Sequence, residues 1–160
     1  MRSCADETRV MGRLRFVALL AVVLAAADLV VAKAAEHHHP GLDHHRSVVW
    51  VGLSLFVFVF AGALACLPSR LLALGCSLQA GGTLGNLLWA MSHGDVVSNS
   101  FVLHGGEGGI AFTLADVFVL VGIAVIVVGS MRMTLRYRHV LPRSTVGVRL
   151  FRRLAVAARR

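Results

Sequence analysis

Residues Gly81 to Asp116 read GGTLGNLLWAMSHGDVVSNSFVLHGGEGGIAFTLAD. A glycine-rich apolar segment leads through a polar loop into a second apolar segment, which carries Asp116 just ahead of the run from Val117 to Val128. A carboxylate inside an apolar helix is costly in a membrane, so a functional role is the first hypothesis and a structural hydrogen bond the alternative. This stretch therefore suggests both the fold class and the candidate site.

Composition indicates the solvent in which the chain folds. The 160 residues are 57% hydrophobic and 15% charged, and their mean hydropathy is +0.76. These values are typical of an integral membrane protein rather than a soluble domain. The formal net charge is +8, but the basic residues gather towards the two ends of the chain. That distribution favours a membrane topology and a membrane lipid partner, and it argues against nucleic acid.

Four apolar runs approach the length of about 20 residues that crosses a bilayer. The predicted helices cover residues 16–35, 48–67, 71–91 and 110–129, and a basic tail follows at 131–160. We therefore expect an all-α membrane domain over residues 1–130, with short outer loops. A cleaved signal peptide is the alternative for the first run, but Asp28 interrupts its apolar core.

The arginines predict the orientation of these helices. They lie before the first helix, at Arg70 between the second and third helices, and throughout the tail, whereas the other two loops contain only Arg46. The positive-inside rule therefore predicts that both termini face the cytoplasm.

Three polar residues lie at a similar depth in this arrangement. At 1.5 Å per residue, Asp28, Asn86 and Asp116 each fall roughly 8–10 Å below the outer end of their predicted helix. Polar groups in lipid tend to face one another, so we expect one polar site that opens outward. In the third helix Gly81, Gly82 and Gly85 would let a neighbouring helix approach closely; the simpler interpretation is that they serve packing alone, with Asn86 as a hydrogen-bonding residue.

Three motifs in this region, which span residues 81–86, 94–98 and 112–116, read GGTLGN, GDVVS and FTLAD. Together they resemble the lipoprotein signal peptidases (signal peptidase II), whose corresponding motifs run approximately GGxxGNxxDR, VVD and FNxAD. That family comprises four-helix membrane aspartic endopeptidases that cleave the signal peptides of prolipoproteins. The resemblance covers the third and fourth predicted helices well and the first weakly.

The family's chemistry needs two neighbouring carboxylates, one protonated and one ionised, to activate a water. The resemblance places Asp116 at one catalytic position and Ser98 at the other, where a hydroxyl cannot act as a general base. It thus implies a family member with impaired or lost catalysis, no cofactor, and a groove able to bind a lipid-anchored or signal-peptide ligand. The expected substrate-binding or structural polar residues are Asn86, Asp28, Lys33 and Thr113.

Two other functions remain open from the sequence. An active aspartic peptidase could recruit Asp95 or Glu107 as its missing carboxylate. A metal-binding or transport-accessory protein could use the imidazoles of the first outer loop, although a histidine-rich tract is only a compositional hint. These histidines are His37, His38, His39, His44 and His45.

Overall fold

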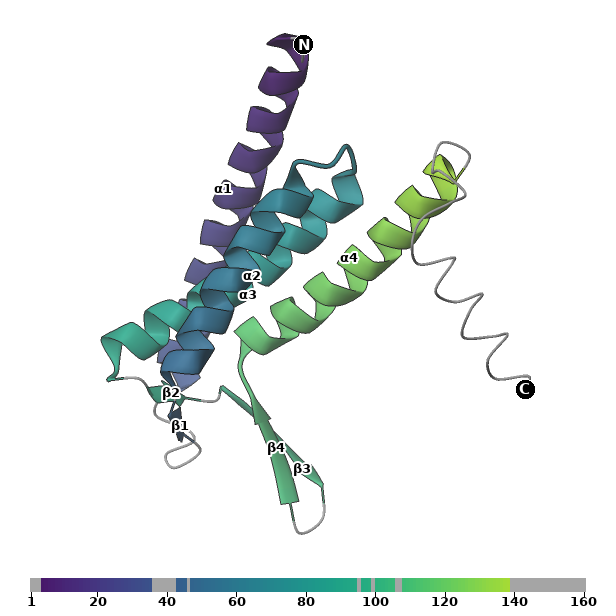
Figure 1. Ribbon diagram of the computed structural model, residues 1–160. Helices are drawn as coiled ribbons and strands as arrows, with labels where there is room; N and C mark the ends of the chain where they lie inside the picture. Colours follow the sequence, from purple (N-terminus) through teal and green to yellow (C-terminus); the bar gives the residue numbers. More distant parts are fainter. Residues whose placement is uncertain are drawn as a thin grey trace, which may run out of the picture. The chain divides into compact units, whose positions relative to one another are not determined.

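The computed structural model describes residues 4–35, 43–45, 47–94, 96–98, 100–105 and 108–138. This part of the chain is mainly helical, as predicted (Figure 1). Its helices are α1 (Cys4–Ala35), α2 (Val48–Ala65), α3 (Arg70–Ser92) and α4 (Leu114–Tyr137). The chain divides into two compact units, Met1–Gly129 and Ser130–Arg160. The helices, sheets and contacts described below belong to the first unit, apart from the last turns of α4.

The connections between helices form two small antiparallel sheets within the described residues. The sequence interpretation did not include them. Strand β1 (Asp43–His45) pairs with β2 (Val96–Ser98), and β3 (Phe101–Gly105) pairs with β4 (Gly108–Phe112). In the second sheet Phe101 is paired with Phe112, and their rings stack with centroids 5.5 Å apart. The connections from α1 to α2 and from α3 to α4 therefore contain β-structure.

Three of the helices are long and apolar enough to cross a membrane. They comprise Glu7–Ala35, Arg70–Ser92 and Leu114–Tyr137, and α2 is a shorter apolar helix. Ser47 begins α2 by accepting the amide hydrogen of Trp50 through its hydroxyl, and Ser69 begins α3 in the same way with Leu72. Such side-chain caps replace hydrogen bonds that the first turn of a helix lacks. The length and apolar composition of the three long helices support a membrane-embedded protein.

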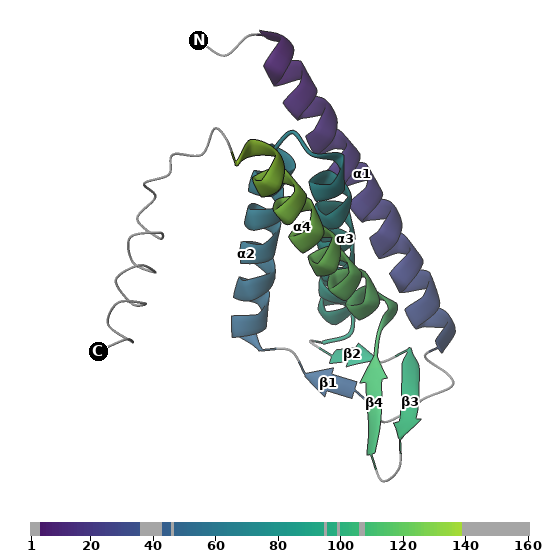
Figure 2. The same ribbon diagram turned by 90° about the vertical axis from the view of Figure 1, so that its right-hand side faces the viewer.

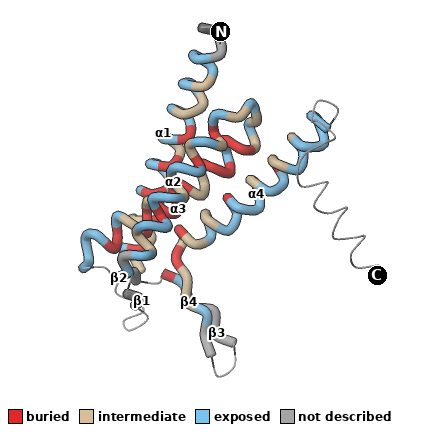
Figure 3. Tube along the Cα trace, viewed as in Figure 1, coloured by how far each residue is buried: buried red, intermediate tan, exposed pale blue. Residues whose placement is uncertain are grey.

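The helices pack with small residues inside and large apolar residues outside. Buried and exposed positions alternate along α1, α2 and α3 (Figure 3). The buried ones are mainly alanine and glycine, whereas Leu19, Val59 and Leu120 are each more than two-thirds exposed. In water this pattern would be unfavourable, but helices in lipid associate through small residues and present large apolar side chains to the acyl chains. The burial pattern thus agrees with a membrane environment.

Glycines set the closest helix contacts. A Cβ added at Gly81 would lie 2.7 Å from the Cβ of Leu24 and 3.0 Å from the carbonyl oxygen of Ala21, so α1 packs directly on α3. A Cβ added at Gly122 of α4 would lie 2.7 Å from the backbone nitrogen of Gln79 in α3. The close approach expected at Gly81 therefore occurs, and α4 carries a matching glycine that the sequence interpretation did not single out.

Both ends of α4 differ from the prediction. Residues 110–112 belong to β4, so α4 begins at Leu114 rather than at Ile110, and it continues to Tyr137 rather than ending at Gly129. A short apolar run does not distinguish a strand from a helix by hydropathy, and the pairing of β4 with β3 decides the outcome here. The first part of the predicted tail is consequently helical.

The other helices also differ from their predicted bounds. Helix α1 begins at Cys4, twelve residues before its predicted start, because hydropathy marks the apolar part of a helix and not its charged first turns. Helix α2 ends at Ala65, two residues early, and Pro68 follows in the connection to α3. Helix α3 is one residue longer at each end.

Candidate functional site

The candidate site is built on the first turn of α4. The hydroxyl of Thr113 accepts the amide hydrogen of Asp116 at 3.1 Å, and the Oδ2 atom of Asp116 accepts the amide hydrogen of Thr113 at 2.9 Å. This reciprocal pair is a capping box, which satisfies two amide groups at the start of the helix. One oxygen of the Asp116 carboxylate therefore has a structural role.

Asn86 connects this turn to α3. Its side-chain nitrogen donates to the Oδ1 atom of Asp116 at 3.1 Å, and its side-chain oxygen accepts from the hydroxyl of Thr113 at 3.2 Å. Asn86 and Thr113 are both buried. Each end of the amide thus has a partner on the same capping box, which fixes the start of α4 against α3.

Asp28 supplies a second carboxylate from α1. Its Oδ1 atom accepts the amide hydrogen of Ala115 at 2.7 Å, and the residue is only 2% exposed. The start of a helix carries a partial positive charge, so a buried carboxylate is stabilised at this position. Helix α1 is thereby joined to the turn that Thr113 and Asn86 already hold.

Gly85 makes room for the Asp28 carboxylate. A Cβ added at Gly85 would lie 2.6 Å from the Oδ2 atom of Asp28, closer than real Cβ contacts allow. Gly82 lets the backbone of α4 approach α3, since a Cβ at this position would collide with the carbonyl oxygen of Ala115. The glycine motif of α3 therefore receives the side chain from α1 at one position and the backbone of α4 at another.

The structure brings Asp28, Asn86, Thr113 and Asp116 together, and we call these four residues the polar cluster. The depth estimate for Asp116 was wrong, however, because it counted from a helix start at Ile110. Asp116 is the third residue of α4. The amide of Ala115, which joins Asp28 to α4, was missed because a backbone donor has no sequence signature; the capping box was signalled locally by Thr-Leu-Ala-Asp.

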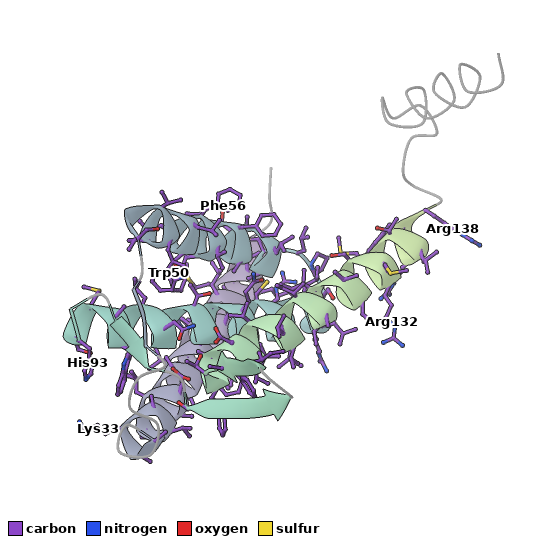
Figure 4. The ribbon with its side chains drawn as sticks, turned by 90° about the horizontal axis from the view of Figure 1, so that it is seen from below. Lys33, Trp50, Phe56, His93, Arg132 and Arg138 are labelled. Atoms are coloured by element: carbon purple, nitrogen blue, oxygen red, sulfur yellow. The ribbon has the colours of Figure 1, made fainter. Side chains whose placement is uncertain are left out.

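Other predicted site residues lie elsewhere. Lys33 is exposed in the last turn of α1 (Figure 4). Ser98 lies in β2, where the strand register pairs it with Asp43 of β1. Asp95, Glu107 and the histidines 37–39 fall outside the described residues. The roles assigned to these residues stay predictions.

The described residues contain no group of three or more histidine, cysteine or acidic side chains arranged to hold a metal ion. His44 and His45 lie in β1, paired with Val97 and Val96. His93 directly follows the last residue of α3, and its ring stacks on Trp89 with centroids 4.1 Å apart. The metal hypothesis thus gains no support from the described part of the chain, and most of its histidines lie outside that part.

The geometry limits the chemistry of the polar cluster. Asp116 is partly exposed, and each of its oxygens accepts one hydrogen bond, which leaves lone pairs for a water or a ligand. Asp28 is buried under the start of α4. The cluster therefore offers one accessible carboxylate rather than the accessible pair that an aspartic peptidase uses.

Comparisons with protein-family models, with curated proteins and with solved structures found no match to this chain. The described residues form a mainly helical fold, in which three helices are long and apolar enough to span a membrane. The resemblance to signal peptidase II consequently rests on the motifs alone.

Proposed function

We propose that the protein crosses the bacterial cell membrane four times, with both termini in the cytoplasm. The fourth span is α2, whose 18 residues extend about 27 Å, close to the hydrocarbon thickness of about 30 Å. Val49, in the first turn of α2, and Val59, in its second half, are 80% and 74% exposed. Lipid is the natural environment for such a helix. The arginine distribution supplies the orientation.

We further propose that this membrane protein is of signal peptidase II type, with impaired or lost catalysis. The observation that carries the proposal is the polar cluster, which joins α1 to two of the three motifs that resemble the family. Asp28 comes from the first helix, Asn86 from the GGTLGN motif, and Asp116 from the FTLAD motif. Asn86 bonds Asp116 directly, and Asp28 bonds the same turn of α4 through the amide of Ala115, although Asp28 is far from both in the sequence.

Two features support the loss of activity. Ser98 occupies the position at which the family has its other catalytic aspartate, and a hydroxyl is a poor base near neutral pH. The remaining carboxylate, Asp116, is engaged by Asn86 and by the backbone of Thr113. The site keeps hydrogen-bonding capacity for a peptide backbone, so the protein binds a lipid-anchored or signal-peptide ligand without cleaving it efficiently.

Expression of the chain in bacteria depleted of their own lipoprotein signal peptidase tests this function. Uncleaved prolipoprotein should accumulate, and it should crosslink to the wild-type chain more than to an Asn86→Leu variant, with the exposed Arg15→Gln variant as a matched control. Full restoration of cleavage would contradict the impaired-enzyme proposal. Crosslinking that is equal for all three chains would contradict ligand binding at the polar cluster.

An active peptidase is the second candidate, because the register of β1 and β2 places Asp43 opposite Ser98. Asp43 is therefore a candidate for the missing carboxylate, beside Asp95 and Glu107. If the wild-type chain restores cleavage, Asp43→Asn should abolish it. Loss of cleavage in Asp95→Asn or Glu107→Gln instead would assign the role to that residue.

A further inference from the structure

A cavity of about 810 Å³ lies at the end of the helices remote from the polar cluster, between α1 and the connection from α2 to α3. Its basic lining consists of Arg9, Arg13 and Arg70, and its apolar lining includes Phe16 and Leu74. This volume is within the usual range for ligand sites, about 300–1,000 Å³. A lining that is basic on one side and apolar on the other favours a ligand with an anionic group and an apolar part.

One face of α1 supplies much of this lining. Arg9, Gly12, Arg13 and Phe16 follow the spacing of three and four residues that places side chains on the same side of a helix. A Cβ added at Gly12 would meet no other atom within 4 Å. The glycine thus leaves open space between the two arginines and the phenyl ring.

The Arg13 side chain lines the cavity and is held in place by one hydrogen bond. Its Nη1 atom donates to the carbonyl oxygen of Leu67 at 3.0 Å, which fixes the guanidinium beside the connection from α2 to α3. The Nε atom of the same side chain is buried and has no hydrogen-bond partner within the described residues. The Nε atom has almost no surface open to the cavity, but the guanidinium carries further N–H donors, for which an anion in the cavity supplies acceptors.

Arg70 adds a second source of positive potential. It is the first residue of α3, where the helix dipole favours a negative charge, and its side chain lines the same cavity as Arg9 and Arg13. Three arginines from two helices therefore converge on one space. Arginine binds phosphate oxygens with paired hydrogen bonds, so a phosphate group fits this end of the cavity.

The apolar lining distinguishes a lipid from a free phosphate. Phe16 is 49% exposed and Leu74 is 39% exposed, at the ends of the apolar parts of α1 and α3. The first turns of α1 extend past the connection between α2 and α3 (Figure 1 and Figure 2). A ligand here would meet arginines on one side and apolar side chains on the other. This is the chemistry of a phospholipid at the membrane surface.

We infer that this cavity binds the phosphate of an anionic membrane lipid, with the acyl chains along Phe16 and Leu74. The anionic cytoplasmic surface of the membrane attracts basic segments at this level. The lipid site is independent of peptidase activity, since it shares no residue with the polar cluster. It anchors the amino-terminal end of α1 to the lipid surface through the headgroup.

Thermal unfolding of the purified full-length protein in a non-ionic detergent tests the inference. Phosphatidylglycerol should raise the melting temperature of the wild-type protein, whereas phosphatidylcholine and inorganic phosphate should have little effect. The Arg9→Gln/Arg70→Gln variant keeps the bond from Arg13 to Leu67, so it should fold. Each lost arginine should weaken phosphatidylglycerol binding about fivefold, or about 25-fold for the pair.

Two further variants make the result specific. Gly12→Leu fills the open space without changing the charge, so it should also weaken binding, and Arg15→Gln removes a charge from the same helix outside the cavity, so it should match the wild type. Equal responses to phosphatidylglycerol and phosphatidylcholine would overturn the inference. So would an effect of Arg15→Gln as large as that of the cavity variants, and an equal response to inorganic phosphate would overturn the assignment to a lipid.

Discussion

Gly85→Ala is the most informative change in the packing of the polar cluster. The added Cβ would lie 2.6 Å from the Oδ2 atom of Asp28, which is 0.8 Å short of the 3.4 Å at which ordinary contact begins. A shift of that size could lengthen the bond from Ala115 to Asp28 from 2.7 Å to about 3.5 Å, the limit of a hydrogen bond. The substitution should therefore separate the Asp28 carboxylate from the start of α4.

The expected loss of stability follows from three contributions. An unpaired buried amide destabilises by about 1–3 kcal/mol, and overpacking adds about 1–3 kcal/mol. The better helix propensity of alanine returns about 1 kcal/mol. Gly85→Ala should therefore lower the free energy of unfolding by about 1–5 kcal/mol, measured by denaturant titration in mixed micelles. In Gly52→Ala, where a Cβ would meet nothing within 4 Å, the free energy should be unchanged or slightly higher.

A double-mutant cycle identifies the cause. Asp28→Ala alone should destabilise by about 1.5–3 kcal/mol, because it removes a charged acceptor from a buried amide. With that carboxylate absent, Gly85→Ala should be less harmful, so the two changes should be non-additive by about 1 kcal/mol or more. Additive effects, or equal stabilities for Gly85→Ala and Gly52→Ala, would refute the packing of Asp28 against Gly85.

Two further predictions use the same unfolding assay. Thr113→Val removes both hydrogen bonds of the capping hydroxyl and should destabilise by about 1–2 kcal/mol; Thr113→Ser should recover most of this, and equal losses in both variants would argue against the capping role. Gly122→Ala places a Cβ 2.7 Å from the backbone nitrogen of Gln79 and should destabilise by about 2 kcal/mol, since a backbone atom cannot turn aside. Gly62→Ala has open space and should be neutral, so similar stabilities for the two alanine variants would contradict the tight contact between α3 and α4.

The helices could be predicted from the sequence, because hydropathy is a local property and a single polar residue changes the mean hydropathy of a long apolar run only slightly. It did not predict the β-structure, because the pairing of Phe101 with Phe112 depends on a partner eleven positions away and on a connecting turn. The start of α4 could have been predicted from the sequence. Thr113 and Asp116 have the spacing of a capping box, but the apolar residues from Ile110 to Phe112 suggested an earlier start.

The polar cluster was predictable in its membership but not in its bonds. Polar side chains at similar depths in apolar helices pointed to Asp28, Asn86 and Asp116 as neighbours. The contact from Asp28 to Ala115 joins residues 87 positions apart and uses a backbone amide, which every residue except proline offers. Only the packing of α1, α3 and α4 reveals that Asp28 serves the start of a helix.

The central claim is that Ser98 stands where a catalytic carboxylate is required, in a site whose other carboxylate is Asp116. Its most direct test is the fraction of prolipoprotein cleaved in signal-peptidase-depleted bacteria that express the wild-type chain, Ser98→Asp, or Ser98→Asp/Asp116→Asn. We predict little or no cleavage by the wild type, a clear gain with Ser98→Asp, and loss of that gain in the double variant. Efficient cleavage by the wild type, or a gain that survives Asp116→Asn, would contradict the account.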